Sequence, residues 1–111
     1  MIRVLVVDDS PTLRRFVVRT LESTGRFVVC GMVEDGRGAT RAVARQEPDV
    51  VVMDMQMPHV DGLTAVREIM SECPCPIVLF CGLGDPRAHE RAFSALAAGA
   101  VALVPKPGPG Q

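Results

Sequence analysis

Three carboxylates stand out because of where they fall relative to the apolar runs of the chain. Asp8 and Asp9 directly follow the apolar run 2–7, and Asp54 ends the run that begins at Val50. If both runs are neighbouring strands of a parallel sheet, their carboxyl ends meet at one edge and the three side chains share a crevice. Carboxylates this close repel one another unless a cation neutralises them. One such Asp would be explained as a cap, but three hard oxygen ligands at one edge predict a Mg²⁺ site, with Mn²⁺ as the alternative.

Lys106 is a candidate counter-charge for the same crevice. It follows the apolar segment 100–104 and lies between Pro105 and Pro107, which restrict the backbone on both sides. An ammonium group held near the strand ends can pair with a carboxylate or with a phosphoryl oxygen. The alternative is an exposed lysine in a linker.

Strand-like and helix-like segments alternate along the whole chain. Continuous apolar runs, typical of strands covered on both faces, occur at 2–7, 28–33, 50–53, 77–80 and, more weakly, 100–104. Apolar residues at helical spacing fill the four stretches between them. The first helix has Ser10 or Asp9 as its cap and Pro11 in its first turn, and the fourth closes at Gly99. This alternation predicts an α/β fold, a doubly wound five-stranded parallel sheet with the flavodoxin-like order 2-1-3-4-5. The carboxylates then lie at its switch point, between strands 1 and 3.

We expect one domain over residues 1–105, followed at 106–111 by the start of a linker rich in proline and glycine. A fold of this kind normally adds a fifth helix after its fifth strand, and we expect that helix to be absent from this chain. One face of the sheet would then carry only the first helix. A downstream segment or a homodimer partner would cover the rest, or it would stay exposed.

Composition excludes several function classes. A net charge of -1 and an aromatic content of 4%, with no Trp or Tyr, argue against nucleic-acid binding by this domain. No apolar stretch approaches the roughly 20 residues of a membrane span, and no signal peptide is recognisable, so we expect a cytoplasmic protein without membrane insertion. The four cysteines form no C-x-x-C pair, which favours free thiols.

Four segments carry a resemblance to a known family, and they read RVLVVDDSPTLRR, PDVVVMDMQMPHVDGL, CPIVLFCG and GAVALVPKP. Together they resemble the receiver domain of response regulators in two-component signalling, most nearly that of chemotaxis protein-glutamate methylesterases. The resemblance implies that Asp54 is the phosphoacceptor and that a histidine kinase is the partner that donates the phosphoryl group. It also implies an output domain or partner protein that the phosphate regulates.

The resemblance assigns further roles position by position. Asp9 would bind the cation directly, Asp8 through water, and the backbone carbonyl of Gln56 would complete the ligand set. Lys106 would neutralise the phosphoryl group. Gln56 and Leu83 would tune the hydrolysis of the phosphoaspartate by controlling the access of water.

Two positions depart from the family pattern. Cys81, followed by Gly82, stands where a Ser or Thr usually donates a hydrogen bond to the phosphoryl group, and a thiol is a weaker donor. Leu103 stands where a Tyr or Phe usually swings inward. The alternative function is therefore a receiver-like interaction module with a damped or phosphorylation-independent switch.

The resemblance does not make this domain an enzyme beyond its own phosphorylation and dephosphorylation, although it leaves room for a methylesterase-like domain after residue 111. An aspartyl-phosphate phosphatase would need a second Asp two residues after Asp54, and Gln56 stands there. By family analogy Arg14, Arg15 and Phe16 are docking candidates for the kinase. The alternative for them is a solvated helix face plus one core aromatic.

Overall fold

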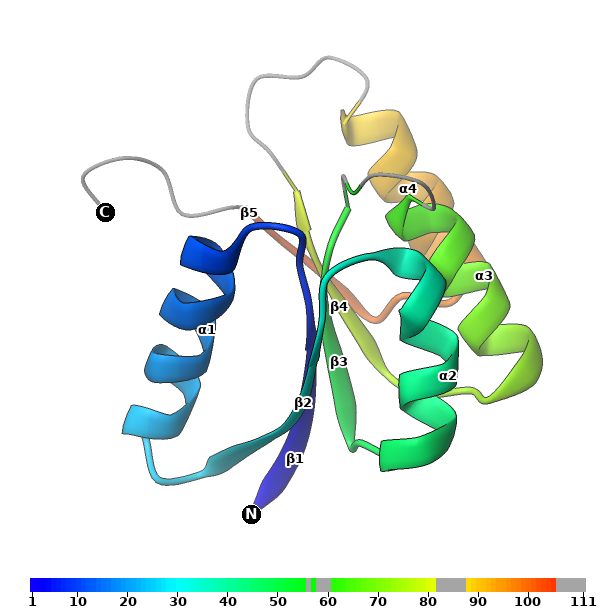
Figure 1. Cartoon of the computed structure of the whole chain (residues 1–111). Helices are drawn as coiled ribbons and strands as arrows, with labels where there is room; N and C mark the ends of the chain where they lie inside the picture. Colours follow the sequence, from blue (N-terminus) through cyan, green and yellow to red (C-terminus); the bar gives the residue numbers. More distant parts are fainter. Residues whose placement is uncertain (56, 58–60, 82–87, 106–111) are drawn as a thin grey trace.

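A computed structural model describes residues 1–55, 57, 61–81 and 88–105 of the chain (Figure 1). Strands and helices alternate throughout, in the order β1 (Ile2–Val7), α1 (Pro11–Ser23), β2 (Phe27–Val33), α2 (Gly36–Gln46), β3 (Val50–Asp54), α3 (Gly62–Glu72), β4 (Ile77–Cys81), α4 (Ala88–Ala98) and β5 (Ala102–Pro105). All strand pairs are parallel, and the sheet order is β2-β1-β3-β4-β5. The predicted fold class and strand order are confirmed.

β1 has the predicted bounds, and the boundaries of the other four strands differ from the predicted ones by one or two residues. β5 starts at Ala102, later than the predicted residue 100, because the backbone at Ala100 is still bonded to α4. The amide of Ala100 donates to the carbonyl of Ala95 in α4, and the amide of Val101 donates to the carbonyl of Ile77. Hydrophobicity alone does not distinguish this connection from the strand.

The sheet separates two unequal apolar layers. Helices α2, α3 and α4 cover one face and α1 lies on the other (Figure 1). The larger core is on the three-helix side and is built around the buried residues Leu5, Val7, Met53, Ile69, Ile77 and Leu79. The smaller core, on the α1 side, is built around Val4, Val6, Val17 and Val52. Alternate residues of β1 therefore serve different cores, as the side-chain period of a strand requires.

Side-chain caps define where the first three helices begin. Ser10 is the cap of α1, since its Oγ accepts from the amide of Leu13 at 3.2 Å, and Pro11 occupies the first turn. This settles the choice that the sequence left open between Ser10 and Asp9. Asp35 caps α2, and Asp61 caps α3 by accepting from the amide of Thr64 at 2.9 Å. These caps fix the helix starts relative to the strand ends, which is where the carboxylates lie.

Among the described helices, α1 is the only one on its side of the sheet (Figure 1). Beside it runs a groove of about 320 Å³, lined by Phe16, Val17, Thr20, Leu21, Phe80, Val104 and Pro105. The side chain of Phe16 is 47% exposed at this groove, so it is not the core aromatic that the sequence allowed. The predicted absence of a fifth helix concerns residues after Pro105, which lie outside the described residues, and dimerisation through this face stays a prediction. Among the described residues, no helix is long and apolar enough to cross a membrane.

Candidate functional site

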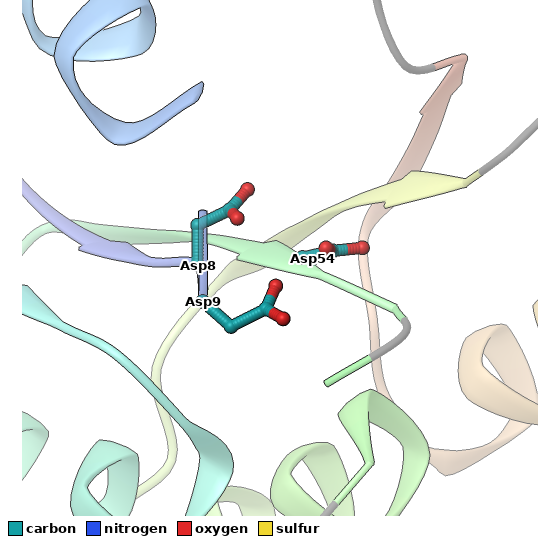
Figure 2. A group of neighbouring side chains, drawn as sticks. All are labelled: Asp8, Asp9 and Asp54. Carbon is teal, nitrogen blue, oxygen red and sulfur yellow. The ribbon is translucent and has the colours of Figure 1, made fainter. Parts of the chain in front are cut away.

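The pairing of β1 with β3 brings the three predicted carboxylates together. Val7 pairs with Met53, so Asp8 and Asp54 follow paired residues on adjacent strands. One ligand oxygen from each of Asp8, Asp9 and Asp54 lies within 4.8 Å of the others. Figure 2 shows the three side chains gathered at the ends of the two strands. The convergence inferred from the sequence is present in the tertiary structure.

Asp8 and Asp9 are sequence neighbours in opposite environments. Asp8 is 2% exposed, whereas Asp9 is exposed to solvent. The amide of Asp8 donates to the carbonyl of Val33 at 3.0 Å, and its carboxylate Oδ1 accepts from the amide of Ser10 at 2.9 Å. Its carbonyl oxygen accepts from Nη1 of Arg14 at 2.6 Å. Asp8 is therefore held in place from several directions, while Asp9 is open to solvent.

Asp54 is buried, at 2% exposed, and the backbone that follows it is fixed on both sides. The amide of Met55 donates to the carbonyl of Phe80 at 2.9 Å, and the carbonyl of Met55 accepts from the amide of Gly62 at 2.9 Å. A Cβ added at Gly62 would lie 2.8 Å from the Cα of Met55 and 3.0 Å from the carbonyl oxygen of Asp54. Gly62 is therefore required because the start of α3 packs directly on the backbone of the candidate phosphoacceptor.

The donor set fits a small hard cation. Carboxylate oxygens are the ligands that Mg²⁺ prefers, and Mg²⁺ is usually bound through one or two carboxylates with the remaining positions left for water and phosphate oxygens. Two of the three carboxylates are almost fully buried, so their charges are weakly screened and a divalent cation between them offsets a strong repulsion. Asp8, Asp9 and Asp54 are the described residues able to hold it.

The remaining predicted site residues are placed only in part. Cys81 ends β4, half-buried, and Leu103 in β5 pairs with Leu79; both pack against the larger core. Gln56, Gly82, Leu83 and Lys106 lie outside the described residues. Their predicted roles as metal ligand, phosphoryl contacts and hydrolysis-tuning residues therefore stay predictions, as do the switch roles of Cys81 and Leu103.

The four cysteines are free thiols, as the sequence predicted. Burial raises the pKa of the Cys73 thiol, and the nearby Glu72 carboxylate raises it further. Burial also raises the pKa of Cys75, with smaller contributions from Cys73 and Asp49. Both thiols line a pocket of about 310 Å³ beside Glu47 and Pro48, which flank the start of β3, at the opposite end of that strand from Asp54. They take no part in the carboxylate cluster.

Comparison with known proteins decides the family. The family described as response regulator receiver domain matches residues 4–111. The chain belongs to this family. It is 45% identical to protein-glutamate methylesterase/protein-glutamine glutaminase 4 of Geobacter metallireducens, over 99% of this chain and 32% of that protein. It is also 45% identical to protein-glutamate methylesterase/protein-glutamine glutaminase 3 of Anaeromyxobacter dehalogenans, over the same shares of the two chains.

Solved structures agree with the sequence relatives. The response regulator domain of Thermotoga maritima CheB superposes with a TM-score of 0.88 and 34% identity, over 96% of this chain and 79% of that one. The signal receiver domain of the NarL response regulator of Mycobacterium tuberculosis superposes with a TM-score of 0.86 and 32% identity, over 96% and 85%. This receiver domain spans about a third of the length of the curated relatives that it matches.

Sequence reasoning missed one residue beside the site. The sequence made Arg14 a docking candidate for the kinase, with a solvated helix face as the alternative, and did not connect it with the carboxylates. In the structure its Nη1 donates to the carbonyl of Asp8, and kinase docking stays a prediction. A signal for this was present, since a long side chain in the first turn of a helix leans toward the helix start, which here is the carboxylate cluster.

Proposed function

We propose that this receiver domain accepts a phosphoryl group on Asp54 from a phosphohistidine of a histidine kinase, in a Mg²⁺-dependent reaction. One observation carries the proposal. The buried carboxylate of Asp54 shares a site less than 5 Å across with the carboxylates of Asp8 and Asp9, at the switch point of the sheet. We also propose that residues 1–105 form the domain and that 106–111 begin a linker.

The reaction needs a nucleophile and charge compensation. A carboxylate oxygen of Asp54 attacks the phosphorus, and an acyl phosphate forms as the phosphorus–nitrogen bond breaks. The electron pair of that bond stays on the ring nitrogen, so the imidazole leaves neutral when its other nitrogen carries a proton. When bound, Mg²⁺ offsets the charge of the phosphoryl oxygens and of the carboxylates.

The two environments of the paired carboxylates support a division of roles. Asp9, which is exposed, would bind the cation directly, and Asp8, which is held by Ser10, would act through a water molecule. The carbonyl of Gln56 would complete the ligand set. Lys106 would neutralise the phosphoryl group, which is the role that an ammonium beside the strand ends can fill.

Acetyl phosphate with Mg²⁺, followed by intact mass measurement, tests the proposal. We expect a single phosphate addition that disappears in Asp54→Asn and that chelation of the metal prevents. Asp49→Asn is the matched control, because Asp49 immediately precedes the same strand β3, at the end away from the site. No addition to the unaltered protein, or an equal addition to Asp54→Asn, would contradict the proposal.

We propose that phosphorylation of Asp54 changes the conformation of the protein surface less than in receiver domains with the usual switch residues. Leu103 packs against the larger core at the position where the family usually has a Tyr or Phe, and Cys81 offers a thiol where the family usually has a hydroxyl. Cys81→Thr should therefore lengthen the lifetime of the phosphoaspartate or enlarge its effect on neighbouring amide signals. Unchanged lifetime and unchanged spectra would show that this position does not limit the switch.

The output is proposed from the relatives. Proteins that match this chain over about a third of their length are named protein-glutamate methylesterases, so we propose that the phosphate regulates a methylesterase-like domain after residue 111. The receiver domain itself would carry no methylesterase activity, and the protein would act in the cytoplasm. Dimerisation through the groove beside α1 is checked by light scattering, and a monomer at all concentrations would remove it.

A further inference from the structure

Arg14 differs from the other arginines of α1 in the direction of its side chain. Arg15 and Arg19 are exposed, whereas Arg14 is half-buried. Its Nη1 donates to the carbonyl of Asp8 at 2.6 Å, a short contact of the kind that a charged donor makes. A guanidinium on a surface helix reaches bulk water at little cost, so its position beside the carboxylate cluster needs a reason.

The contact fixes a positive charge at the rim of the site. Asp8 is held from β2 through its amide and from the start of α1 through its carboxylate, so the carbonyl that accepts from Arg14 does not move freely. The backbone of Arg14 is fixed as well, because its amide donates to the carbonyl of Ser10 at 2.9 Å. With both ends held, the guanidinium is an oriented charge and not a mobile surface cation.

We propose that the positive charge of Arg14 helps to draw the anionic phosphoryl donor to the carboxylate cluster. The inference rests on the proposed function of the same site. Three carboxylates attract a cation strongly but repel a phosphoryl group. The guanidinium of Arg14 is held at the backbone carbonyl of Asp8, whose carboxylate belongs to the cluster, and its charge weakens that repulsion. The same charge opposes the binding of a cation. Arg14 therefore acts with opposite sign on the two ligands that the reaction requires.

This opposition separates a role of the charge from a merely structural one. Removing the charge strengthens the binding of Mg²⁺ and weakens the use of an anionic donor. Loosening of the site, by contrast, weakens both. Arg14→Met removes the charge and keeps most of the apolar stem, whereas Arg14→Lys keeps a charge on a similar stem. Arg15→Met is the matched control, since it removes an exposed arginine next to Arg14 on the same helix.

The test measures two quantities for the unaltered chain and the three variants. Calorimetric titration gives the Mg²⁺ dissociation constant, and the rate of phosphate addition at varied acetyl phosphate gives the KM for the donor. For Arg14→Met we expect a Mg²⁺ dissociation constant about threefold lower, which is a change of about half a decade. We expect a donor KM about threefold to tenfold higher, which is a change of about half a decade to one decade. Arg14→Lys and Arg15→Met should stay within about twofold of the unaltered chain in both quantities.

Three results would overturn the inference. In Arg14→Met they are weaker binding of both Mg²⁺ and the donor, or no change in the Mg²⁺ dissociation constant and the donor KM. The third is a rise of the donor KM in Arg14→Lys as large as that in Arg14→Met. The metal titration keeps this inference separate from the proposed function. If the unaltered chain takes no phosphate, the phosphoacceptor role fails, and the comparison of Mg²⁺ affinities still decides whether the charge of Arg14 acts on the cluster.

Discussion

Gly62→Ala perturbs the backbone of the phosphoacceptor without touching its side chain. The added Cβ would lie 2.8 Å from the Cα of Met55, 2.9 Å from its carbonyl oxygen and 3.0 Å from the carbonyl oxygen of Asp54. All three atoms are backbone, so no rotamer change relieves the overlap. Relief requires a shift of the start of α3, and that shift strains the hydrogen bond from the amide of Gly62 to Met55.

The magnitude follows from two opposing effects. Overpacking that displaces backbone costs about 1–3 kcal/mol, and alanine regains up to about 1 kcal/mol of helix propensity relative to glycine. The net loss is about 1–2 kcal/mol, which moves the midpoint of urea unfolding by about 1 M for a domain of this size. Displacement of Asp54 should also slow phosphate addition at least about tenfold, since in-line attack tolerates little misplacement.

Gly38→Ala is the matched control for this prediction. There the new Cβ meets one side-chain atom, the Cγ1 of Val33 at 3.0 Å, and no backbone atom, so a small shift of one side chain relieves the contact. Helix propensity then balances or exceeds the contact, and we expect stability within about 0.5 kcal/mol of the unaltered chain or above it. If Gly62→Ala unfolds at the same urea concentration as Gly38→Ala and takes phosphate at the normal rate, the reasoning about Gly62 is wrong.

Three further predictions test the cap, the metal ligand and the thiols of Cys73 and Cys75. Ser10→Ala removes the cap of α1 and the unfolding free energy should fall by about 1 kcal/mol in urea titration. Asp9→Asn removes one of three clustered charges, so calorimetry should show Mg²⁺ affinity lower by at least about tenfold while the metal-free protein becomes no less stable. Cys73 and Cys75 should alkylate slowly at pH 8 by mass analysis and become fast in urea, because their raised pKa keeps them as thiols. The folded state keeps the thiol protons to a higher pH than the unfolded state does. The unfolding free energy is therefore unaffected below about pH 8.5 and falls as the pH rises above it.

Each of these predictions has an outcome that contradicts it. An unchanged urea midpoint for Ser10→Ala would mean that the hydroxyl does not cap α1. Undiminished Mg²⁺ affinity in Asp9→Asn would remove Asp9 from the ligand set. Alkylation of the two thiols at equal rates with and without urea would contradict their protection by the folded structure, in which Cys75 is buried and Cys73 half-buried.

Much of the fold was readable from the sequence because it depends on local patterns. Continuous apolar runs separated by helical spacing specify a parallel sheet covered on both faces, and right-handed crossovers leave few strand orders. The sheet order then places the residues after β1 and at the end of β3 at one edge, which is why the convergence of Asp8, Asp9 and Asp54 could be predicted. Departures from the family pattern at Cys81 and Leu103 were equally visible, since they need only residue identities.

Only the tertiary structure decided how the parts of the site differ from one another. Asp8 and Asp9 have the same side chain, yet Asp8 is buried and its carboxylate accepts from the amide of Ser10, whereas Asp9 faces solvent. Gly62 is required because the backbone of Asp54 and Met55 leaves no room for a Cβ there. Arg14 is turned toward the cluster because its guanidinium donates to the carbonyl of Asp8, which precedes α1. Such contacts depend on distances between elements that pack together, and those distances are fixed by the whole core and not by any local pattern of residues.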